Sequence, residues 1–329
     1  MKVSIIGSNS FSGSSFIKYL LERDYEVLAI SRSGEPDDVF LPYKWENREV
    51  SNLSFVQLDL NKNLKEIIQR IRNFRPNYIV NFAAQGMVAE SWKTPEDWYQ
   101  TNVVSQVKLH DSLRKFDFLD KFLNFSTPEV YGNTKGWVDE GYRFCPNTPY
   151  AVSRASCDLH LMSFLKNYDF PVTFTRAANV FGEGQQLYRI VPKTIISGLL
   201  RTKLNLHGGG TSERSFIHIE DVSDATYKVM KDGVIGETYH ISTEETLTIK
   251  ELVWTIAARI GRNPDEFVVN TDERLGKDHS YALDSGKIRS ELSWRDMISL
   301  EAGIDRTIRW VESNLGVLKK MPAMYIHKS

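Results

Sequence analysis

A hydroxyl, a carboxylate and a phenol fall within one short stretch of this sequence. Thr127 and Glu129 follow an apolar run, Phe122–Phe125, that is typical of a buried parallel strand. Tyr150 opens a helical pattern, and Arg154 follows it by four residues, so the two side chains share one helix face. A cation there lowers the pKa of a phenol from about 10 toward neutrality. The spacing predicts that Tyr150 is a usable base; the alternative is a surface tyrosine beside a surface arginine.

A glycine-containing turn follows the first apolar run, Val3–Ile6, and leads into a helical pattern. It reads Gly7-Ser-Asn-Ser10-Phe11-Ser-Gly13. A strand, a glycine turn and a helix in this order are the context of a dinucleotide-binding fingerprint. Gly7 permits the tight turn, Gly13 lets the helix pack on the strand, and the helix amino terminus faces the pyrophosphate. Ser10 stands where the pattern has a glycine, and the alternative is a structural turn.

These residues need a scaffold, and residues 1–180 alternate between strand-like and helical patterns. The strand-like runs are Val3–Ile6, Val27–Ile30, Ser54–Leu58, Tyr78–Phe82, Phe122–Phe125 and Val172–Thr175. Such alternation indicates parallel strands joined by right-handed crossovers. The predicted fold class is α/β, a Rossmann-type doubly wound parallel sheet.

After Gly182 the pattern changes to short, mixed elements. We expect them to form a smaller mixed α/β substrate-binding domain over the carboxyl edge of the sheet. Residues 1–180, with returns near 217–242, are assigned to an NAD(P)-binding domain. Residues 183–216 and 243–329 are assigned to the substrate-binding domain.

The end of the second strand indicates which dinucleotide binds. An NAD-binding protein usually carries an acidic residue there for the ribose, whereas this chain has Ser31, Arg32 and Ser33, and its first acid is Glu35. Guanidinium binds phosphate in a planar, bidentate way, so Arg32 favours the 2′-phosphate of NADP. NADP is therefore predicted, with NAD as the alternative.

Two further strand ends carry residues for the same ligand. Asp59 and Leu60 end the third strand and are placed to meet the adenine. The stretch that ends in Ala83, Ala84 and Gln85 follows the fourth strand and lines the nicotinamide side, with Gln85 toward the substrate.

Composition excludes several other classes of function. The 329 residues are 41% hydrophobic and 25% charged, with a formal net charge of −1. No overall basic field therefore points to nucleic acid or a membrane surface. The cysteines, Cys145 and Cys157, are too few for a disulfide framework or a metal site, which fits a cytoplasmic location. The seven histidines show no metal-binding spacing, and the amino-terminal strand indicates no signal peptide or membrane span.

Together these residues resemble the extended short-chain dehydrogenase/reductase family, and within it the nucleotide-sugar 4,6-dehydratases of the dTDP-glucose and GDP-mannose type. The likeness covers nearly the whole chain. Beyond the glycine turn, its motifs are Asn81-Phe-Ala-Ala, Ser126-Thr-Pro-Glu-Val-Tyr-Gly, Pro149-Tyr-Ala-Val-Ser, Asn179-Val-Phe-Gly, Arg214-Ser-Phe-Ile-His-Ile-Glu-Asp-Val and Glu273-Arg-Leu-Gly-Lys-Asp. This series is specific for the family and less specific for the reaction.

The resemblance implies a redox cycle that leaves its cofactor as it began. Tyr150 takes the proton of the sugar 4-hydroxyl while hydride leaves C4, and Thr127 hydrogen-bonds that oxygen. The 4-ketone acidifies the C5 hydrogen, which Glu129 removes; water leaves from C6 and the hydride returns there. The implied product is a 4-keto-6-deoxy nucleotide sugar.

Two residues depart from the family pattern. Dehydratases often carry an aspartic acid that protonates the departing hydroxyl, and this chain has Pro128 there. General acid catalysis is worth about 10² to 10⁴ in rate, so the proton must come from elsewhere, and Glu129 can carry it in a syn elimination. Arg154 replaces the family's lysine, which changes how the cation meets the nicotinamide ribose.

The substrate diphosphate needs a local group of cations. The matches to the family are Asn179, Arg214 and Arg274, and Arg189 and Lys193 are further candidates on a helix of the substrate-binding domain. For each of them the alternative is a solvated surface residue. The sequence does not indicate which nucleotide base or which hexose the substrate carries.

We predict a nucleotide-sugar 4,6-dehydratase, and three other kinds of enzyme with the same scaffold are the alternatives. These are a 4-epimerase, a decarboxylase and a 4-oxidase. Pro128 favours them, while Glu129 favours elimination because an epimerase needs no base at C5; a decarboxylase keeps such a glutamate as well. An alternative that is not an enzyme is a non-catalytic dinucleotide-binding protein.

Helices near 98–116 and 150–168 pair as a dimer interface in relatives, so a homodimer is expected.

Overall fold

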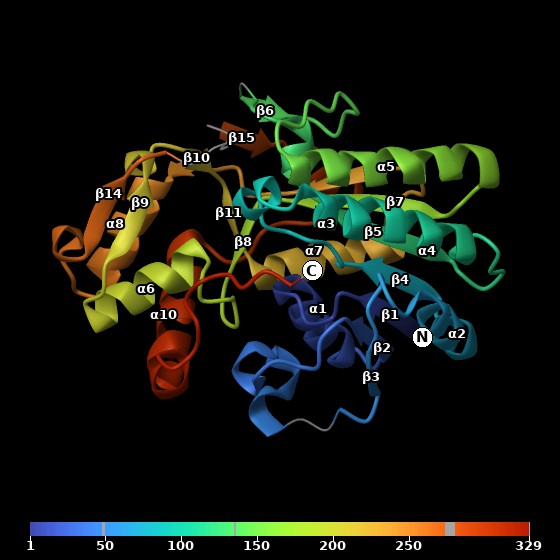
Figure 1. The fold of residues 1–329 in the computed structure, drawn as a ribbon, viewed down its shortest axis with the longest axis horizontal. Helices are drawn as coiled ribbons and strands as arrows, with labels where there is room; N and C mark the ends of the chain where they lie inside the picture. The colour runs from blue at the N-terminus through green and yellow to red at the C-terminus, as the bar shows by residue number, and fades with distance from the viewer. Residues whose placement is uncertain (48–49, 135, 274–279, 329) are drawn as a thin grey trace.

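A seven-stranded, all-parallel sheet is the centre of the computed structural model, which describes residues 1–47, 50–134, 136–273 and 280–328. The strand order is β12-β7-β5-β4-β1-β2-β3 (Figure 1). The strands are β1 (Lys2–Ile6), β2 (Glu26–Ser31), β3 (Leu53–Gln57), β4 (Tyr78–Asn81), β5 (Lys121–Ser126), β7 (Val172–Ala177) and β12 (Thr238–Ile241). The predicted α/β class with a Rossmann-type doubly wound sheet is confirmed.

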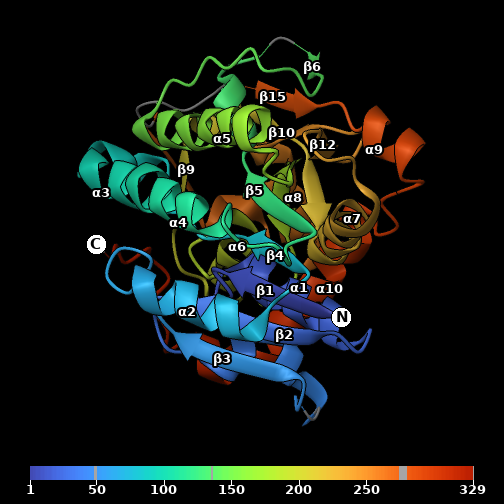
Figure 2. The same ribbon diagram turned by 90° about the vertical axis from the view of Figure 1, so that its right-hand side faces the viewer.

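Helices cover both faces of this sheet, as Figure 2 shows. On one face the helices that share an apolar core with the sheet are α1 (Phe11–Leu21), α7 (Ile219–Asp232) and α9 (Gly286–Glu291). On the other face they are α2 (Leu64–Phe74), α4 (Ser105–Leu113) and α5 (Pro149–Tyr168). In β1, Val3 and Ile5 join the first core and Ile6 joins the second. Because successive strand side chains alternate between faces, a strand covered on both sides is apolar throughout, which explains the continuous runs in the sequence.

The direction in which the strands are added to the sheet reverses beside β1. From β1 the chain continues to β2 and β3 on one side, and then crosses to β4, β5, β7 and β12 on the other. Parallel α/β sheets bind ligands at such a reversal, outside the carboxyl ends of the strands. Residues that follow β1, β2, β4 and β5 therefore meet at one edge.

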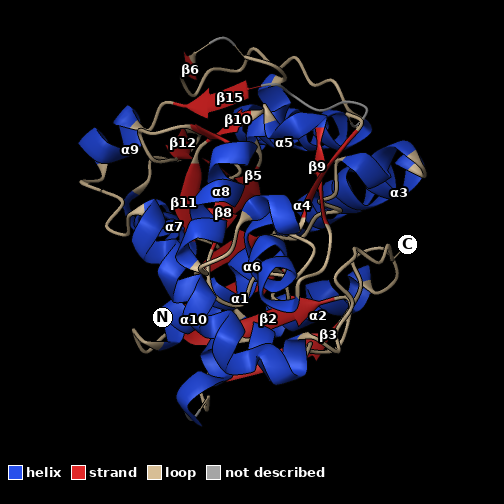
Figure 3. Cartoon of the chain, turned by 90° about the vertical axis from the view of Figure 1, so that its left-hand side faces the viewer, coloured by secondary structure: helices blue, strands red, loops and turns tan. Residues whose placement is uncertain are grey.

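The elements outside the sheet form a separate apolar core. Helices α6 (Ile190–Leu200), α8 (Ile249–Arg259) and α10 (Leu300–Leu318) supply most of it (Figure 3). Strands β9 (Leu204–His207) and β14 (Val268–Thr271) pair beside α8. The remaining short strands are β6 (Trp137–Val138), β8 (Asn179–Phe181), β10 (Glu213–Arg214), β11 (Phe216–His218), β13 (Leu247–Thr248) and β15 (Ser280–Leu283), and α3 (Pro95–Tyr99) completes the helices. Of the helices that are described, none has the length and apolarity that a membrane span needs.

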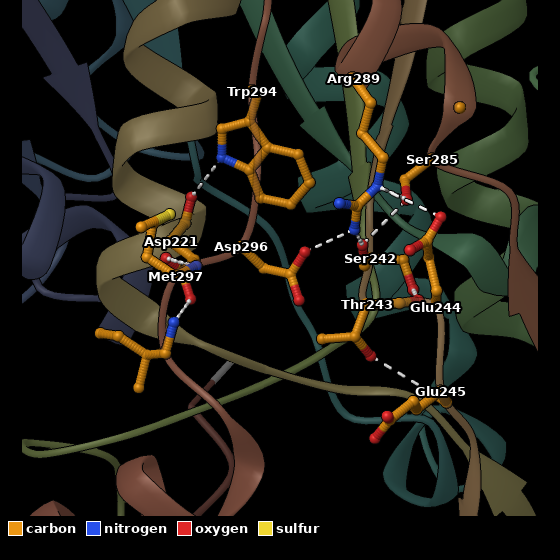
Figure 4. Close-up of polar contacts among 12 residues, drawn as sticks. Asp221, Ser242, Thr243, Glu244, Glu245, Ser285, Arg289, Trp294, Asp296 and Met297 are labelled. Atoms are coloured by element: carbon orange, nitrogen blue, oxygen red, sulfur yellow. Dashed lines mark hydrogen bonds and ion pairs between the residues drawn. The ribbon is translucent and has the colours of Figure 1, made fainter.

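A polar junction fastens the segment after α9 to the start of α7 (Figure 4). The carboxylate of Asp221, in the first turn of α7, accepts hydrogen bonds from the main-chain N–H groups of Met297 (2.9 Å) and Ile298 (3.1 Å). The indole of Trp294 donates to the Asp221 carbonyl at 3.2 Å, and Arg289 pairs with Asp296 at 2.5 Å. These contacts fix the chain that leads into α10 against the sheet.

Candidate active site

Thr127 and Glu129 lie where β5 ends and a short 3-10 turn, Pro128–Tyr131, begins. Thr127 continues the extended strand (φ −146°, ψ 146°), and Pro128 takes the first position of the turn, which its fixed φ suits. The Thr127 hydroxyl donates a hydrogen bond to the Glu129 carboxylate. The turn therefore holds a hydroxyl and a carboxylate together at the carboxyl edge of the sheet.

Tyr150 and Arg154 lie in the first turns of α5. The helix is capped by Thr148, whose hydroxyl accepts from the main-chain N–H of Ala151 at 3.1 Å. Both functional side chains are buried, Tyr150 being 8% and Arg154 2% exposed. The guanidinium of Arg154 donates a hydrogen bond to the carbonyl oxygen of Phe125 in β5. The alternative of a surface pair is therefore wrong.

The pKa of Tyr150 corrects the prediction made from spacing. Burial raises this pKa, and the negative charge of Glu129 raises it further. The charge of Arg154, a hydrogen bond with Thr127 and the charge of Arg189 lower it without outweighing burial. The net pKa lies above the ordinary value of a phenol, so the expected shift toward neutrality is wrong. The prediction considered only the effect of the nearby cation on the pKa of Tyr150. The larger effect is the burial of the phenol, which depends on the tertiary fold.

Thr127 links the carboxylate of Glu129 to the phenol of Tyr150. Its side chain hydrogen-bonds both the Glu129 carboxylate and the Tyr150 phenol. The structure thus brings together the hydroxyl, the carboxylate and the phenol that the sequence singled out, from the end of β5 and the start of α5.

A buried ion pair ties this turn to α5 from behind. Asp158, two helical turns after Tyr150, pairs with Arg176 of β7 at 2.9 Å, and both side chains are fully buried. Asp158 also accepts hydrogen bonds from Ser126 (2.6 Å) and Asn124 (2.9 Å). Because Ser126 directly precedes Thr127, the pair fixes the start of the turn Pro128–Tyr131.

The same arginine fixes the end of the turn. Arg176 donates to the Tyr131 hydroxyl at 2.8 Å, and that hydroxyl lies 2.8 Å from Nε2 of His240. Burial lowers the pKa of His240 to about 3, and the charge of Arg176 lowers it too, so its ring is neutral. Both ends of the segment from Thr127 to Tyr131 are thus held by one buried polar network.

The glycine turn has the close packing that a dinucleotide fingerprint requires. Gly7 has a positive φ of 84°, and a Cβ on it would lie 2.6 Å from the main-chain nitrogen of Ala83. A Cβ on Gly13 would lie 2.5 Å from the Gly7 carbonyl oxygen. Ser10 caps α1: its hydroxyl donates to the Gly7 carbonyl (2.7 Å) and accepts from Gly13 N–H (3.0 Å). Phe11 opens the helix, and its side chain belongs to the apolar core that α1 shares with the sheet.

The residues after β2 make contacts with the far end of the chain. Ser31 ends the strand, and Arg32 donates to the carbonyl oxygen of Lys328 at 2.9 Å. The ammonium of Lys328 lies 3.2 Å from the Ser33 hydroxyl. Glu35 accepts hydrogen bonds from a neighbouring tyrosine (2.6 Å) and lysine (2.8 Å).

The residues after β3 and β4 divide into buried and accessible groups. The Asp59 carboxylate accepts from the main-chain N–H two residues further on (2.8 Å), and Leu60 is buried. Ala84 is exposed, whereas Gln85 is buried and its main-chain N–H donates to Asn102 at 2.8 Å. The Gln85 amide donates to a carbonyl of the carboxyl-terminal segment at 2.7 Å.

The candidate phosphate ligands lie on three elements outside the sheet. Asn179 begins β8, Arg189 caps α6 and is exposed, and Lys193 lies in the first turn of that helix. Arg214, in β10, is buried and donates to the preceding carbonyl at 2.6 Å. Of these, Arg189 is near enough for its charge to act on Tyr150. Arg274 lies outside the described residues.

The family assignment comes from a match along most of the sequence. A family model described as GDP-mannose 4,6 dehydratase matches residues 5–307. The chain belongs to this family. The resemblance predicted from the motifs, to short-chain dehydrogenase/reductases of the nucleotide-sugar 4,6-dehydratase type, is confirmed.

Curated and solved relatives align with this member of the dehydratase family over nearly the full length of both chains. The chain is 32% identical to the dTDP-glucose 4,6-dehydratase of Streptomyces antibioticus, covering 98% of this chain and 97% of that protein. It is 31% identical to the low-salt glycan biosynthesis protein Agl12 of Haloferax volcanii, covering 94% and 97%. Among solved structures, DesIV of Streptomyces venezuelae, a dTDP-glucose 4,6-dehydratase with NAD and TYD bound, is 29% identical with a TM-score of 0.88, covering 96% and 98%.

Sequence reasoning missed two groups of residues at this site. One is the buried network of Asp158 and Arg176; its signal was a lone arginine in a strand that is otherwise apolar or hydroxylic, because buried charges are nearly always paired. The other is the carboxyl-terminal segment, whose sequence carries no motif. Among the described residues there is no group of three or more His, Cys, Asp or Glu that could hold a metal ion.

Proposed function

We propose that this enzyme is a nucleotide-sugar 4,6-dehydratase that converts a nucleoside diphosphate hexose to its 4-keto-6-deoxy derivative. The observation that carries the proposal is the contact of Thr127 with both Glu129 and Tyr150. With a bound nicotinamide to accept hydride, a phenol and a hydroxyl suffice for oxidation of a carbinol carbon, and the adjoining carboxylate adds a base for a second position. Oxidation at C4 followed by proton removal at C5 needs this pair of groups.

In the first step the chain's residues handle the 4-hydroxyl. When the sugar binds, the Thr127 hydroxyl turns its hydrogen from Glu129 to the sugar 4-oxygen, and the Tyr150 phenolate takes the proton of the 4-hydroxyl. A bound nicotinamide supplies redox chemistry, accepting hydride from C4 and giving it back at C6. Because the pKa of Tyr150 is raised by burial and by Glu129, this step needs the positive charge of Arg154 to favour the phenolate.

In the second step Glu129 acts on C5 and C6. Its carboxylate takes the C5 proton, which the 4-ketone acidifies, and delivers that proton to the departing C6 hydroxyl, so water leaves and a C5–C6 double bond forms. The route replaces the general acid absent at Pro128. After hydride returns to C6, C5 regains the proton equivalent that Tyr150 took, and the balance is loss of one water.

We infer that the cofactor is a nicotinamide dinucleotide held at the glycine turn. The close main-chain packing at Gly7 and Gly13, which leaves no room for a side chain, is that of a dinucleotide fingerprint, and the amino end of α1 suits a pyrophosphate. Arg32, with Glu35 engaged elsewhere, favours NADP, whereas the solved relative DesIV has NAD. Denaturing the purified protein and chromatographing the released nucleotide distinguishes them; release of NAD alone would reject NADP.

The substrate diphosphate is assigned to Arg189, Lys193 and Arg214, with Asn179 at the pocket wall. Guanidinium groups match phosphate oxygens well. The exposed Arg189 at the amino end of α6 is the best supported, because its charge already acts on Tyr150. The bound TYD of DesIV suggests a thymidine nucleotide among the substrates to test.

A homodimer in the cytoplasm completes the proposal. Tyr99, Val104 and Leu159 are 38%, 40% and 51% exposed on the helical segments expected to pair. Two free thiols, Cys145 and Cys157, suit a reducing compartment. Sedimentation at several protein concentrations tests the dimer, and a monomer throughout would reject it.

The experiment that tests the reaction is incubation with dTDP-glucose, UDP-glucose, GDP-mannose, CDP-glucose and UDP-glucuronic acid, followed by mass spectrometry and, for the configuration at C4, NMR spectroscopy. A product lighter by one water identifies the dehydratase. A product of unchanged mass with inverted C4 would identify a 4-epimerase instead, loss of carbon dioxide from a glucuronic acid substrate a decarboxylase, and a 4-keto product that keeps its C6 hydroxyl a 4-oxidase. In Tyr150→Phe no substrate should be oxidised; unaltered turnover would remove Tyr150 from its role.

A further inference from the structure

The last described residues of the chain return to the carboxyl edge of the sheet. After α10 the chain leaves the outer core and ends at the periphery of the molecule beside α3 (Figures 2 and 3). We call Tyr325–Lys328 the C-terminal strap. Its side chains alternate in exposure. Tyr325 and His327 are half-buried, while Ile326 is 62% exposed and Met324, just before the strap, is 76% exposed.

One carbonyl group of the strap bridges two strand ends of the sheet. The carbonyl oxygen of Lys328 accepts from Arg32 (2.9 Å) and from Gln85 (2.7 Å). Arg32 follows β2 and Gln85 follows β4, and β1 lies between these strands. Neighbouring strands are about 4.8 Å apart, so the two strand ends are separated by roughly 10 Å. The strap therefore crosses the end of β1, where Gly7 begins the turn assigned to the pyrophosphate.

The strap is anchored on both sides of this crossing. The His327 ring stacks on the buried Trp98 of α3, with centroids 5.0 Å apart and planes 8° apart, and its Nε2 lies 2.7 Å from Asp97. The Tyr325 ring meets the Tyr188 ring edge to face at 5.4 Å. Tyr188 directly precedes Arg189 at the cap of α6, so the strap spans from α3 to the substrate side.

Apart from two ring contacts, the strap is held by hydrogen bonds, most of them to exposed or half-buried groups, which suits a segment that opens and closes. Lys328 is exposed, and among the strap's four residues His327 and Tyr325 are the two that pack rings against the body of the protein. Segments with few buried contacts open at low free-energy cost compared with global unfolding. The groups that the strap holds, Arg32, Ser33 and Gln85, are those assigned to the dinucleotide and substrate.

We propose that the C-terminal strap is part of the dinucleotide site and covers the bound cofactor, so that the cofactor exchanges only when the strap releases. The inference rests on the proposed function for the identity of the ligand as a nicotinamide dinucleotide. It gives the strap a purpose in that reaction: the hydride is returned within each cycle, so a cofactor that leaves slowly does not limit turnover.

The rate of cofactor release tests the strap without any sugar present. The protein is loaded with NADH or NADPH and mixed with excess oxidised nucleotide, and the loss of nucleotide fluorescence is followed. His327→Ala and Tyr325→Ala remove the two ring contacts and should raise the dissociation rate about tenfold. The matched control, Met324→Ala, changes an outward residue beside the strap and should stay within about twofold. Equal rates in all variants would overturn the proposal.

A second measurement separates a strap that covers the cofactor from one that blocks its entry. Amide hydrogen exchange of Tyr325–Lys328 should slow when NADH or NADPH is added, because the strap closes over the ligand. Faster or unchanged exchange, or variants that bind faster without releasing faster, would overturn the proposal. Failure of the dehydratase assignment would appear separately, as absence of water loss in the mass spectra.

Discussion

The guanidinium of Arg154 donates a hydrogen bond to the main-chain carbonyl oxygen of Phe125. Arg154 belongs to α5 and Phe125 to β5, so the arginine joins the helix that carries Tyr150 to the strand that leads to Thr127. It therefore has two roles, one of position and one of charge. A lysine at this position would supply the positive charge but not the planar guanidinium that reaches this carbonyl.

Comparing Arg154→Met with Arg154→Lys separates these two roles. The charge of Arg154 lowers the pKa of Tyr150, so its loss raises that pKa further. A base with a higher pKa is deprotonated only at higher pH, so the acidic limb of the C4 oxidation rate should move to higher pH. Arg154→Lys keeps the charge and should keep the limb near its original position. Single-turnover reduction of the bound cofactor across pH measures both; coincident limbs for Arg154→Met and the parent enzyme would contradict the role of charge.

Replacing Glu129 by glutamine should uncouple oxidation from elimination. The amide cannot take the C5 proton, so water loss should fall by about 10² to 10⁴ and reduced cofactor should accumulate, visible by its absorbance. Since the Glu129 charge raises the pKa of Tyr150, its removal should move the acidic limb of C4 oxidation to lower pH, opposite to Arg154→Met. Glu66→Gln, an exposed position on α2, is the control. Full elimination in Glu129→Gln would reject this base.

The sheet was predictable because its strands are covered on both faces and must be apolar throughout. The site was predictable where residues of a reactive type directly follow a predicted strand, as Thr127 and Glu129 do. The pKa of Tyr150 was not, since burial follows from packing that no spacing reveals. The strap was not either, because its contact with Arg32 joins residues 296 positions apart. Ser10 shows a third case: the sequence marks a departure from glycine, and only the structure shows the hydroxyl capping α1.

The buried pair of Asp158 and Arg176 should dominate the stability of the site. Asp158→Asn leaves a buried guanidinium without its counter-charge, which is expected to reduce the free energy of unfolding by about 3 to 5 kcal/mol. The exposed pair of Arg75 and Asp117 (3.4 Å) is the matched control, and Asp117→Asn should change it by less than about 1 kcal/mol. Urea unfolding measures both. Equal effects would mean that burial does not decide the strength of these pairs.

Glu183 should make stability depend on pH in the acid range. Burial raises the pKa of its carboxyl, but a hydrogen bond from His218 and the charges of His218 and Arg306 hold the pKa at about 2. Because the folded value lies below the ordinary 4.5, the stabilisation is complete above pH 4.5 and is lost as pH falls toward 2. Glu183→Gln should therefore cost about 3 kcal/mol at neutral pH and progressively less in acid. Thermal unfolding at several pH values tests this, with the exposed Glu312→Gln as control; a constant difference would contradict it.

Two glycine-to-alanine changes should have opposite signs. At Gly7 the positive φ of 84° strains any side chain, and the new Cβ would lie 2.6 Å from the main-chain nitrogen of Ala83, which follows β4 and has little freedom to shift. Gly7→Ala should destabilise the fold by about 1 to 2 kcal/mol or more and abolish measurable binding of NADH and NADPH. Gly316, in α10, has nothing within 4 Å of its Cβ position, so Gly316→Ala should stabilise by about 0.5 to 1 kcal/mol and leave binding unchanged. Dinucleotide titration with denaturant unfolding measures both effects, and tight binding by Gly7→Ala would separate the turn from the cofactor.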